Sequence, residues 1–189
     1  MFNSSMIWDT PAEEPWVVWL VTVVLVVAAV IDGKLLKVPN WLTFPMILSG
    51  WAYSAYAFGW EGIGWSLAGT GVGLAVLLPA YAIGGMGAGD VKLMAGIGAW
   101  CWSTITLFAF CASAVVGGAL AVAMVLIQGK WSHHRNQFFG ILNEISTIRD
   151  PNKLAAIAAD RKSTMMLLPY GIPMAIGTIA YFAWMGMLM

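Results

Sequence analysis

From Leu93 to Gly129 the chain reads LMAGIGAWCWSTITLFAFCASAVVGGALAVAMVLIQG, and no charged residue stands between Lys92 and Lys130. As a single α-helix rising about 1.5 Å per residue, this stretch would be roughly 56 Å long. The hydrocarbon core of a bilayer is only about 30 Å thick. The stretch is therefore predicted to cross a membrane twice, with a break at Trp100-Cys101-Trp102-Ser103.

The composition of the whole chain agrees with a membrane protein. Of its 189 residues, 60% are hydrophobic and only 10% are charged, whereas a soluble domain carries about 25% charged residues. We expect one all-α membrane-embedded domain over residues 1–189. Six transmembrane helices are predicted, at about residues 16–31, 41–58, 63–83, 90–101, 103–128 and 165–188.

The distribution of charge predicts the orientation of these helices. Acidic residues precede the first apolar segment, so that segment is predicted to be a retained helix and not a signal peptide. With the N-terminus outside, six crossings place every lysine and arginine on the cytoplasmic side, as the positive-inside rule requires. These residues are Lys34, Lys37, Lys92, Lys130, Arg135, Arg149, Lys153, Arg161 and Lys162.

Two further patterns concern packing. In the predicted cytoplasmic loop 129–164, apolar residues recur at helical spacing from Phe138 to Ile148. This indicates an amphipathic helix that lies on the inner membrane surface or packs on the bundle. Gly69 and Gly73 have the Gly-x-x-x-Gly spacing that lets transmembrane helices approach closely.

Asp32 and Asp90 are the acidic residues that need an explanation. Each is predicted at the cytoplasmic end of a transmembrane helix, and ionisable groups at membrane depth are costly and often functional. A structural role is possible for each. Asp90 is a suitable N-cap for the helix that follows it, and Asp32 could be a boundary charge paired with Lys34 or Lys37.

Together the two aspartates permit an aspartyl-protease dyad. Like charges that share one site cannot both ionise easily, so one carboxyl stays protonated and the other activates a water. No His-Glu-x-x-His or Gly-x-Ser-x-Gly pattern offers another hydrolytic centre. Cys101, Cys111 and the adjacent His133 and His134 do not form a metal-binding pattern, so no metal or cofactor is predicted. The zero net charge gives no sign of nucleic-acid binding.

Three motifs resemble the type IV prepilin peptidase family. They are Gly87-Ala88-Gly89-Asp90-Val91-Lys92-Leu93, the Val38-Pro39-Asn40 that follows Asp32, and Pro169-Tyr170-Gly171 near the last helix. The third departs from the family pattern, because Ile172 stands before Pro173. The resemblance covers about residues 16–177.

The resemblance implies a specific activity. Asp32 and Asp90 would be the catalytic residues of a bacterial inner-membrane endopeptidase. This enzyme would remove the short basic leader from prepilins or pseudopilins, cutting after a glycine on the cytoplasmic side. Supporting or substrate-binding roles would fall to Pro39, Asn40, Gly87, Gly89, Lys92, Pro169, Tyr170 and Gly171. The segment from Pro169 to Gly171 is interpreted chiefly as a helix break, with a tyrosine hydroxyl near the dyad as the open alternative.

Other functions remain open at this point. The chain resembles the short, methyltransferase-lacking members found in tight-adherence (Flp) pilus systems, so we expect no N-methylation. A non-enzymatic transporter or channel component would use Asp32 and Asp90 to handle cations or protons. An archaeal preflagellin peptidase is a closer alternative than a presenilin-type peptidase, whose Tyr-Asp and Pro-Ala-Leu elements are absent from the sequence.

Overall fold

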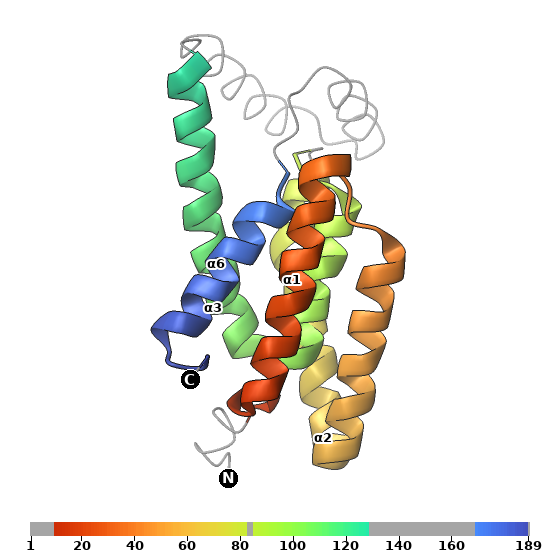
Figure 1. Ribbon diagram of the computed structural model, residues 1–189. Coiled ribbons are helices and arrows are strands. Elements are labelled where there is room, and N and C mark those ends of the chain that lie inside the picture. The colour runs from red at the N-terminus through yellow and green to blue at the C-terminus, as the bar shows by residue number, and fades with distance from the viewer. Residues whose placement is uncertain (1–9, 83–84, 129–168, 189) are drawn as a thin grey trace.

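The computed structural model describes residues 10–82, 85–128 and 169–188. Most of these residues are helical and none lies in a strand, as the sequence predicted. A short 3-10 helix, η2 (Pro11–Glu13), precedes α1 (Pro15–Leu35), α2 (Asn40–Ala82), α3 (Ala88–Gln128) and α6 (Gly171–Trp184) (Figure 1). In this part of the chain, α1, α2 and α3 are long and apolar enough to cross a membrane.

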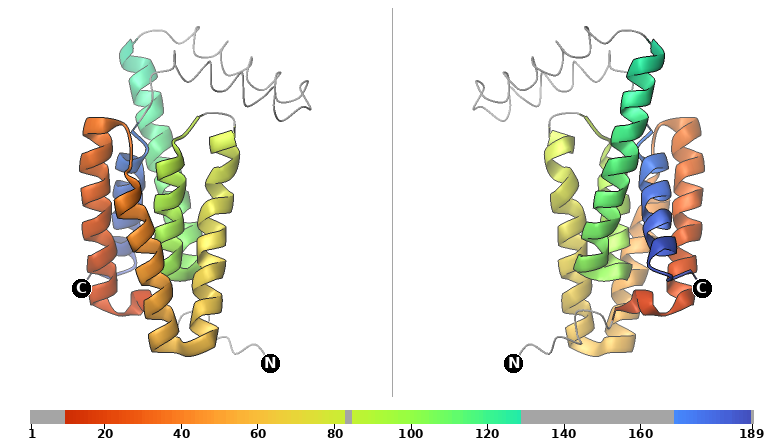
Figure 2. Two further views of the ribbon diagram at one scale, coloured as in Figure 1. Left: turned by 90° about the vertical axis from the view of Figure 1, so that its right-hand side faces the viewer. Right: turned by 90° about the vertical axis from the view of Figure 1, so that its left-hand side faces the viewer.

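Helices α2 and α3 each contain one residue with non-helical backbone angles. In α2 it is Gly59, with φ 65° and ψ −148°, and in α3 it is Trp102, with φ 60° and ψ −172°. In Figure 2 the chain runs down one arm of each helix and returns along the other. The predicted segment 41–58 and residues 63–82 of the predicted segment 63–83 thus lie in the two arms of α2, and residue 83 lies outside the described residues. The predicted segments 90–101 and 103–128 lie in the two arms of α3. Trp102 falls inside the stretch where the sequence predicted a break.

Glycines allow α2 and α3 to pack closely, because no side chain separates the two backbones at these positions. A Cβ built on Gly69 would overlap the carbonyl of Gly98, and one built on Gly73 would overlap that of Met94. This confirms the close approach that the Gly-x-x-x-Gly spacing predicted. The second arm of α2 is therefore fixed against the arm of α3 that begins near Asp90.

Helix α6 starts later than the predicted segment 165–188. Residues 165–168 lie outside the described residues, and the helix begins at Gly171. Pro169 precedes the helix, and its carbonyl accepts the N–H of Ile172 at 3.1 Å. Pro173 lies in the first helical turn, where its missing N–H breaks no helical hydrogen bond. Helix α6 packs against α1 and α3. The predicted amphipathic loop 129–164 also lies outside the described residues.

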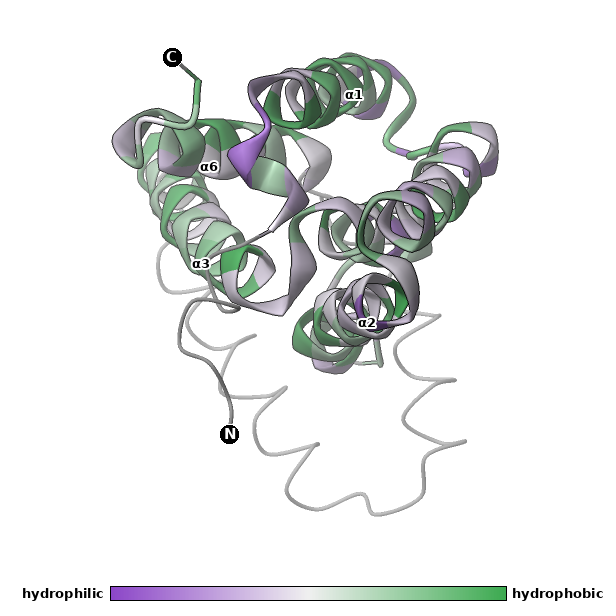
Figure 3. Cartoon of the chain, turned by 90° about the horizontal axis from the view of Figure 1, so that it is seen from below, coloured by the Kyte–Doolittle hydropathy of each residue, from purple (hydrophilic) through white to green (hydrophobic). Residues whose placement is uncertain are grey.

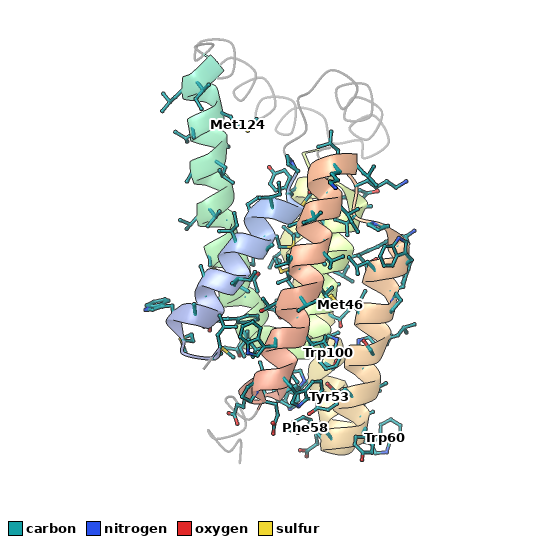
Figure 4. The ribbon with its side chains drawn as sticks, viewed as in Figure 1. Met46, Tyr53, Phe58, Trp60, Trp100 and Met124 are labelled. Atoms are coloured by element: carbon teal, nitrogen blue, oxygen red, sulfur yellow. The ribbon has the colours of Figure 1, made fainter. Side chains whose placement is uncertain are left out.

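Aromatic side chains fill the end of the bundle where η2 lies. Tyr53 stacks on Trp100 with ring centroids 5.4 Å apart, and the Trp100 indole donates to the Met46 carbonyl at 2.9 Å (Figure 4). The sides of the helices are largely hydrophobic (Figure 3). Exposed large apolar side chains there include Val23, Val30, Leu78, Val115 and Ile127. Such a surface suits contact with lipid.

Candidate active site

Asp32 lies in the last turn of α1 and is only 3% exposed. The backbone N–H of Gly171 donates to its Oδ2 at 2.7 Å. The helix does not end at residue 31, as the hydropathy pattern suggested. It continues to Leu35, where Leu36 adopts a left-handed conformation and donates its N–H to the Asp32 carbonyl. Asp32 is therefore a buried carboxyl and not an exposed charge at a membrane boundary.

Asp90 is the third residue of α3 and is 6% exposed. Its Oδ2 accepts the N–H of Gly87 at 3.2 Å, and Gly87 is the residue just before the helix. This is the return contact of a capping box, in which the third helical residue bonds the N-cap N–H. The N-cap role considered for Asp90 is therefore wrong. Because α3 begins at Ala88, its N-cap is Gly87, and Asp90 lies three positions later. The glycines before Asp90 supply its hydrogen-bond partner.

The linker between α1 and α2 holds the start of α3. A Cβ on Gly89 would stand 2.6 Å from the carbonyl oxygen of Val38, so the two backbones touch where only glycine fits. Lys92 donates from Nζ to Oδ1 of Asn40 at 2.9 Å, and the same ammonium lies 4.8 Å from the centroid of the Phe44 ring. The segment that follows Asp32 is thereby bonded to the helix that carries Asp90.

Pro39 and Tyr170, two of the predicted supporting residues, accept backbone hydrogen bonds at the starts of α2 and α6. The carbonyl of Pro39 accepts the N–H of Leu42 at 3.1 Å at the start of α2. The carbonyl of Tyr170 accepts the N–H of Met174 at 3.1 Å at the start of α6. Pro39 therefore starts the helix that carries Asn40, as Tyr170 starts the helix that carries Gly171.

The Tyr170-Gly171 segment lies against Asp32. Gly171 binds Asp32 directly, and a Cβ at this position would fall 2.9 Å from Asp32 Oδ2. Tyr170 is half-buried and lies within electrostatic reach of the Asp90 carboxylate. The sequence indicated a helix break here, and the structure adds a direct contact with the site. The glycine after Tyr170, which is the first residue of α6, was the available signal for a backbone donor.

The contact with Phe44 was not anticipated from the sequence. Asn40 and Phe44 are four residues apart, so they share a face of α2, but nothing in the sequence identified Lys92 as their common partner. Among the described residues, no group of three or more His, Cys, Asp or Glu side chains gathers at a possible metal site. The polar contacts described are those of two buried carboxyls with one backbone donor each, and the Lys92–Asn40 bond between the α1–α2 linker and α3.

The model of the type IV leader peptidase family matches residues 19–122, which is more than half of the chain and includes both aspartates. The chain belongs to the type IV leader peptidase family. Its resemblance to prepilin peptidases, drawn first from three short motifs, is thereby established.

Curated relatives carry corresponding names. The chain is 29% identical over 126 residues to a "Prepilin leader peptidase/N-methyltransferase" of Aeromonas hydrophila, a match that covers 62% of this chain and 42% of the relative. Against the protein of that name from Aeromonas salmonicida strain A449 it is 29% identical over 136 residues, covering 68% and 45%. A "Leader peptidase HopD" of Salmonella typhimurium is 32% identical over 107 residues, covering 52% and 68%.

This leader peptidase family member spans less than half the length of the two Aeromonas relatives. No solved structure gives a significant match. The family match ends at residue 122, before the Pro169–Gly171 segment. The contact between Gly171 and Asp32 is therefore a feature that the structure adds to the matched region.

Proposed function

We propose that this chain is an aspartic endopeptidase that removes the basic leader of type IV prepilin-like proteins. The observation that carries the proposal is the burial of two carboxyls from different helices, Asp32 and Asp90, each of which accepts a backbone N–H from a glycine. Family membership supports a peptidase. The buried carboxyls support the aspartic type, because burial keeps such a pair from ionising fully.

In the proposed reaction the two carboxyls share one proton and one water. The ionised carboxyl takes a proton from the water, which attacks the scissile carbonyl carbon. The protonated carboxyl donates to the carbonyl oxygen, and a tetrahedral intermediate forms without an acyl-enzyme. The N–H groups of Gly171 and Gly87 orient the two carboxyls through the bonds described above. Collapse of the intermediate returns one proton to the leaving amine.

The proposal includes a membrane orientation. With α2 and α3 each counted as two crossings, the chain makes six, with its N-terminus outside. Asp32 and Asp90 then lie in the cytoplasmic leaflet of a bacterial inner membrane, because both are close to the lysines that the positive-inside rule assigns to that side. The substrate would be cut after a glycine on that side, just before its apolar segment.

The transporter alternative uses the same aspartates but is not favoured by membership of a peptidase family. The absence of N-methylation stays a prediction. An assay that follows methyl transfer beside cleavage separates the two activities.

The function is tested by reconstituting the protein in liposomes with a synthetic precursor. The precursor has a basic leader, one glycine and an apolar segment, and the products are mapped by mass spectrometry. We expect one cut, after the glycine, and none when that glycine is replaced by valine. A cut elsewhere would refute the proposed specificity, and an uncut precursor would refute the proposed function for this substrate class.

A further inference from the structure

An open groove of about 520 Å³ runs between α1 and α6 on the outer surface of the bundle. Val26, Val30 and Lys34 line it from α1, each about one helical turn after the last. Ile172 and Ile176 line it from α6 at the same spacing. The side chains of Val26, Val30 and Ile176 are exposed. The groove is therefore an apolar surface that is accessible from outside the bundle.

Small residues make room in this groove. Ala29 and Gly33 line it from α1, and Ala175 lines it from α6. A Cβ built on Gly33 would stand 3.4 Å from Cδ1 of Ile172, so the two helices come close together at this level. Lys34 is the one charged residue among the described residues of the lining. The groove thus has a charged end at Lys34 and an apolar length that leads away from it.

The groove covers the depth of one leaflet. Helix α1 has 21 residues, and at about 1.5 Å per residue it is roughly 31 Å long, close to the hydrocarbon core of about 30 Å. Lys34 is the last residue but one of this helix, so its ammonium lies at the level of the lipid headgroups. From Val26 to Lys34 the helix rises about 12 Å, which is most of the roughly 15 Å of a single leaflet.

These dimensions and this charge fit a phospholipid. Basic side chains at the cytoplasmic end of a groove between transmembrane helices bind anionic headgroups, and a lysine stem can cover apolar surface while its ammonium stays in the headgroup region. In the proposed orientation Lys34 lies in the cytoplasmic leaflet, where anionic lipids are found. A transmembrane helix would need a surface through both leaflets, whereas this groove extends only to about the middle of α1, at Val26.

We infer that this groove binds an anionic phospholipid, with its phosphate at the Lys34 ammonium and one acyl chain along the apolar lining. The site adjoins the contact between Asp32 and Gly171, because Gly33 and Ile172 are the residues that follow these two in the sequence. A bound chain fills the outer side of this contact between α1 and α6 and stabilises it. The binding needs no substrate, so the inference does not depend on the proposed peptidase function.

The headgroup contact is tested by native mass spectrometry of the full-length protein in detergent. Phosphatidylglycerol and phosphatidylcholine with the same acyl chains are added in steps, and the first binding event is compared. We expect the wild type to bind phosphatidylglycerol about fivefold more tightly, the factor for about 1 kcal/mol per lysine at a membrane surface. Lys34→Met keeps the stem and should lose this preference. Lys37→Met, an exposed lysine that does not line the groove, should keep it.

The acyl-chain contact is tested by filling the groove. Val30→Trp and Ile176→Trp each place a large ring in it, from α1 and from α6. Either variant should weaken binding of phosphatidylglycerol at least about tenfold, because two displaced CH₂ groups at about 0.8 kcal/mol each correspond to that factor. Val23→Trp is the matched control, since Val23 is an exposed residue of α1 outside the lining. An unchanged melting temperature without lipid shows that each variant is folded, and phosphatidylglycerol should raise the melting temperature of the wild type and of Val23→Trp.

Three results would overturn the inference. Equal affinity of the wild type for the two lipids would mean that Lys34 does not select a charge. An equal loss in Lys37→Met and Lys34→Met would mean that the attraction is general to the basic linker. Folded Val30→Trp and Ile176→Trp variants that bind phosphatidylglycerol like Val23→Trp would mean that the chain lies elsewhere and that the groove is left for a protein partner.

Discussion

Replacing Lys92 by methionine is expected to lower kcat about 10- to 30-fold, with little change in KM. Lys92 joins the α1–α2 linker to α3 through Asn40 and Phe44. Methionine keeps an unbranched apolar stem over the Phe44 ring and removes the ammonium. The aspartates then lose one of the contacts that set their spacing, whereas the peptide-binding surface is unchanged.

The magnitude follows from the two contacts. The 2.9 Å hydrogen bond to Asn40 is solvent-accessible, so about 1 kcal/mol is an appropriate value. The cation–π contact at 4.8 Å adds about 0.5–1 kcal/mol at an accessible site. The loss of about 1.5–2 kcal/mol from the active arrangement corresponds to the stated range, since about 1.4 kcal/mol is tenfold.

The assay is a double-mutant cycle with Asn40→Ala, Lys92→Met and the double variant, in which kcat and KM are measured separately. Because the two side chains bond each other, the double variant should be little worse than Lys92→Met alone. Lys37→Met, an exposed lysine in the same linker, serves as the control. Additive losses, or a rise in KM without a fall in kcat, would refute the positioning role.

Two other glycine positions give sharp expectations. Gly171→Ala should lower kcat at least about tenfold with a nearly unchanged melting temperature. Its Cβ would press on Asp32 Oδ2 at 2.9 Å, while the backbone donor remains. Full activity of this variant would contradict the contact between Gly171 and Asp32. Gly98→Val should lower stability in detergent by about 1–3 kcal/mol, the usual cost of overpacking, because its side chain would overlap the backbone of Gly69; an unchanged thermal melt would contradict the close packing. Gly64→Ala, where nothing lies within 4 Å of an added Cβ, is the control for both.

Much of the helical arrangement was predictable from chain length and hydropathy. The charge-free stretch after Lys92 is too long for one crossing, and the structure has its non-helical residue at Trp102. The ends of helices were less predictable, because hydropathy stops at the first charge whereas backbone hydrogen bonding continues. Helix α1 therefore runs on to Leu35 and contains Asp32.

The identity of the two candidate catalytic residues was also predictable, but their partners were not. Two lone aspartates at helix ends stand out in a chain with so few charges. The donor to Asp32 comes from Gly171, which is 139 residues away in sequence, and Lys92 meets Asn40 across 52 residues. Such contacts depend on how α1, α3 and α6 pack. Local spacing gives no information about them.

The most direct test of the dyad compares single-turnover cleavage by Asp32→Asn, Asp90→Asn and Glu61→Gln with the wild type. Each variant converts a carboxyl to an amide of equal size. Glu61 is exposed and follows the non-helical Gly59 by two residues, and α2 reverses direction at the end of the bundle opposite to the C-terminal end of α1 (Figure 2). The proposed mechanism predicts that both aspartate variants stay folded and lose at least about 100-fold in rate, while Glu61→Gln cleaves like the wild type. Cleavage at the wild-type rate by either folded aspartate variant would contradict the aspartyl mechanism.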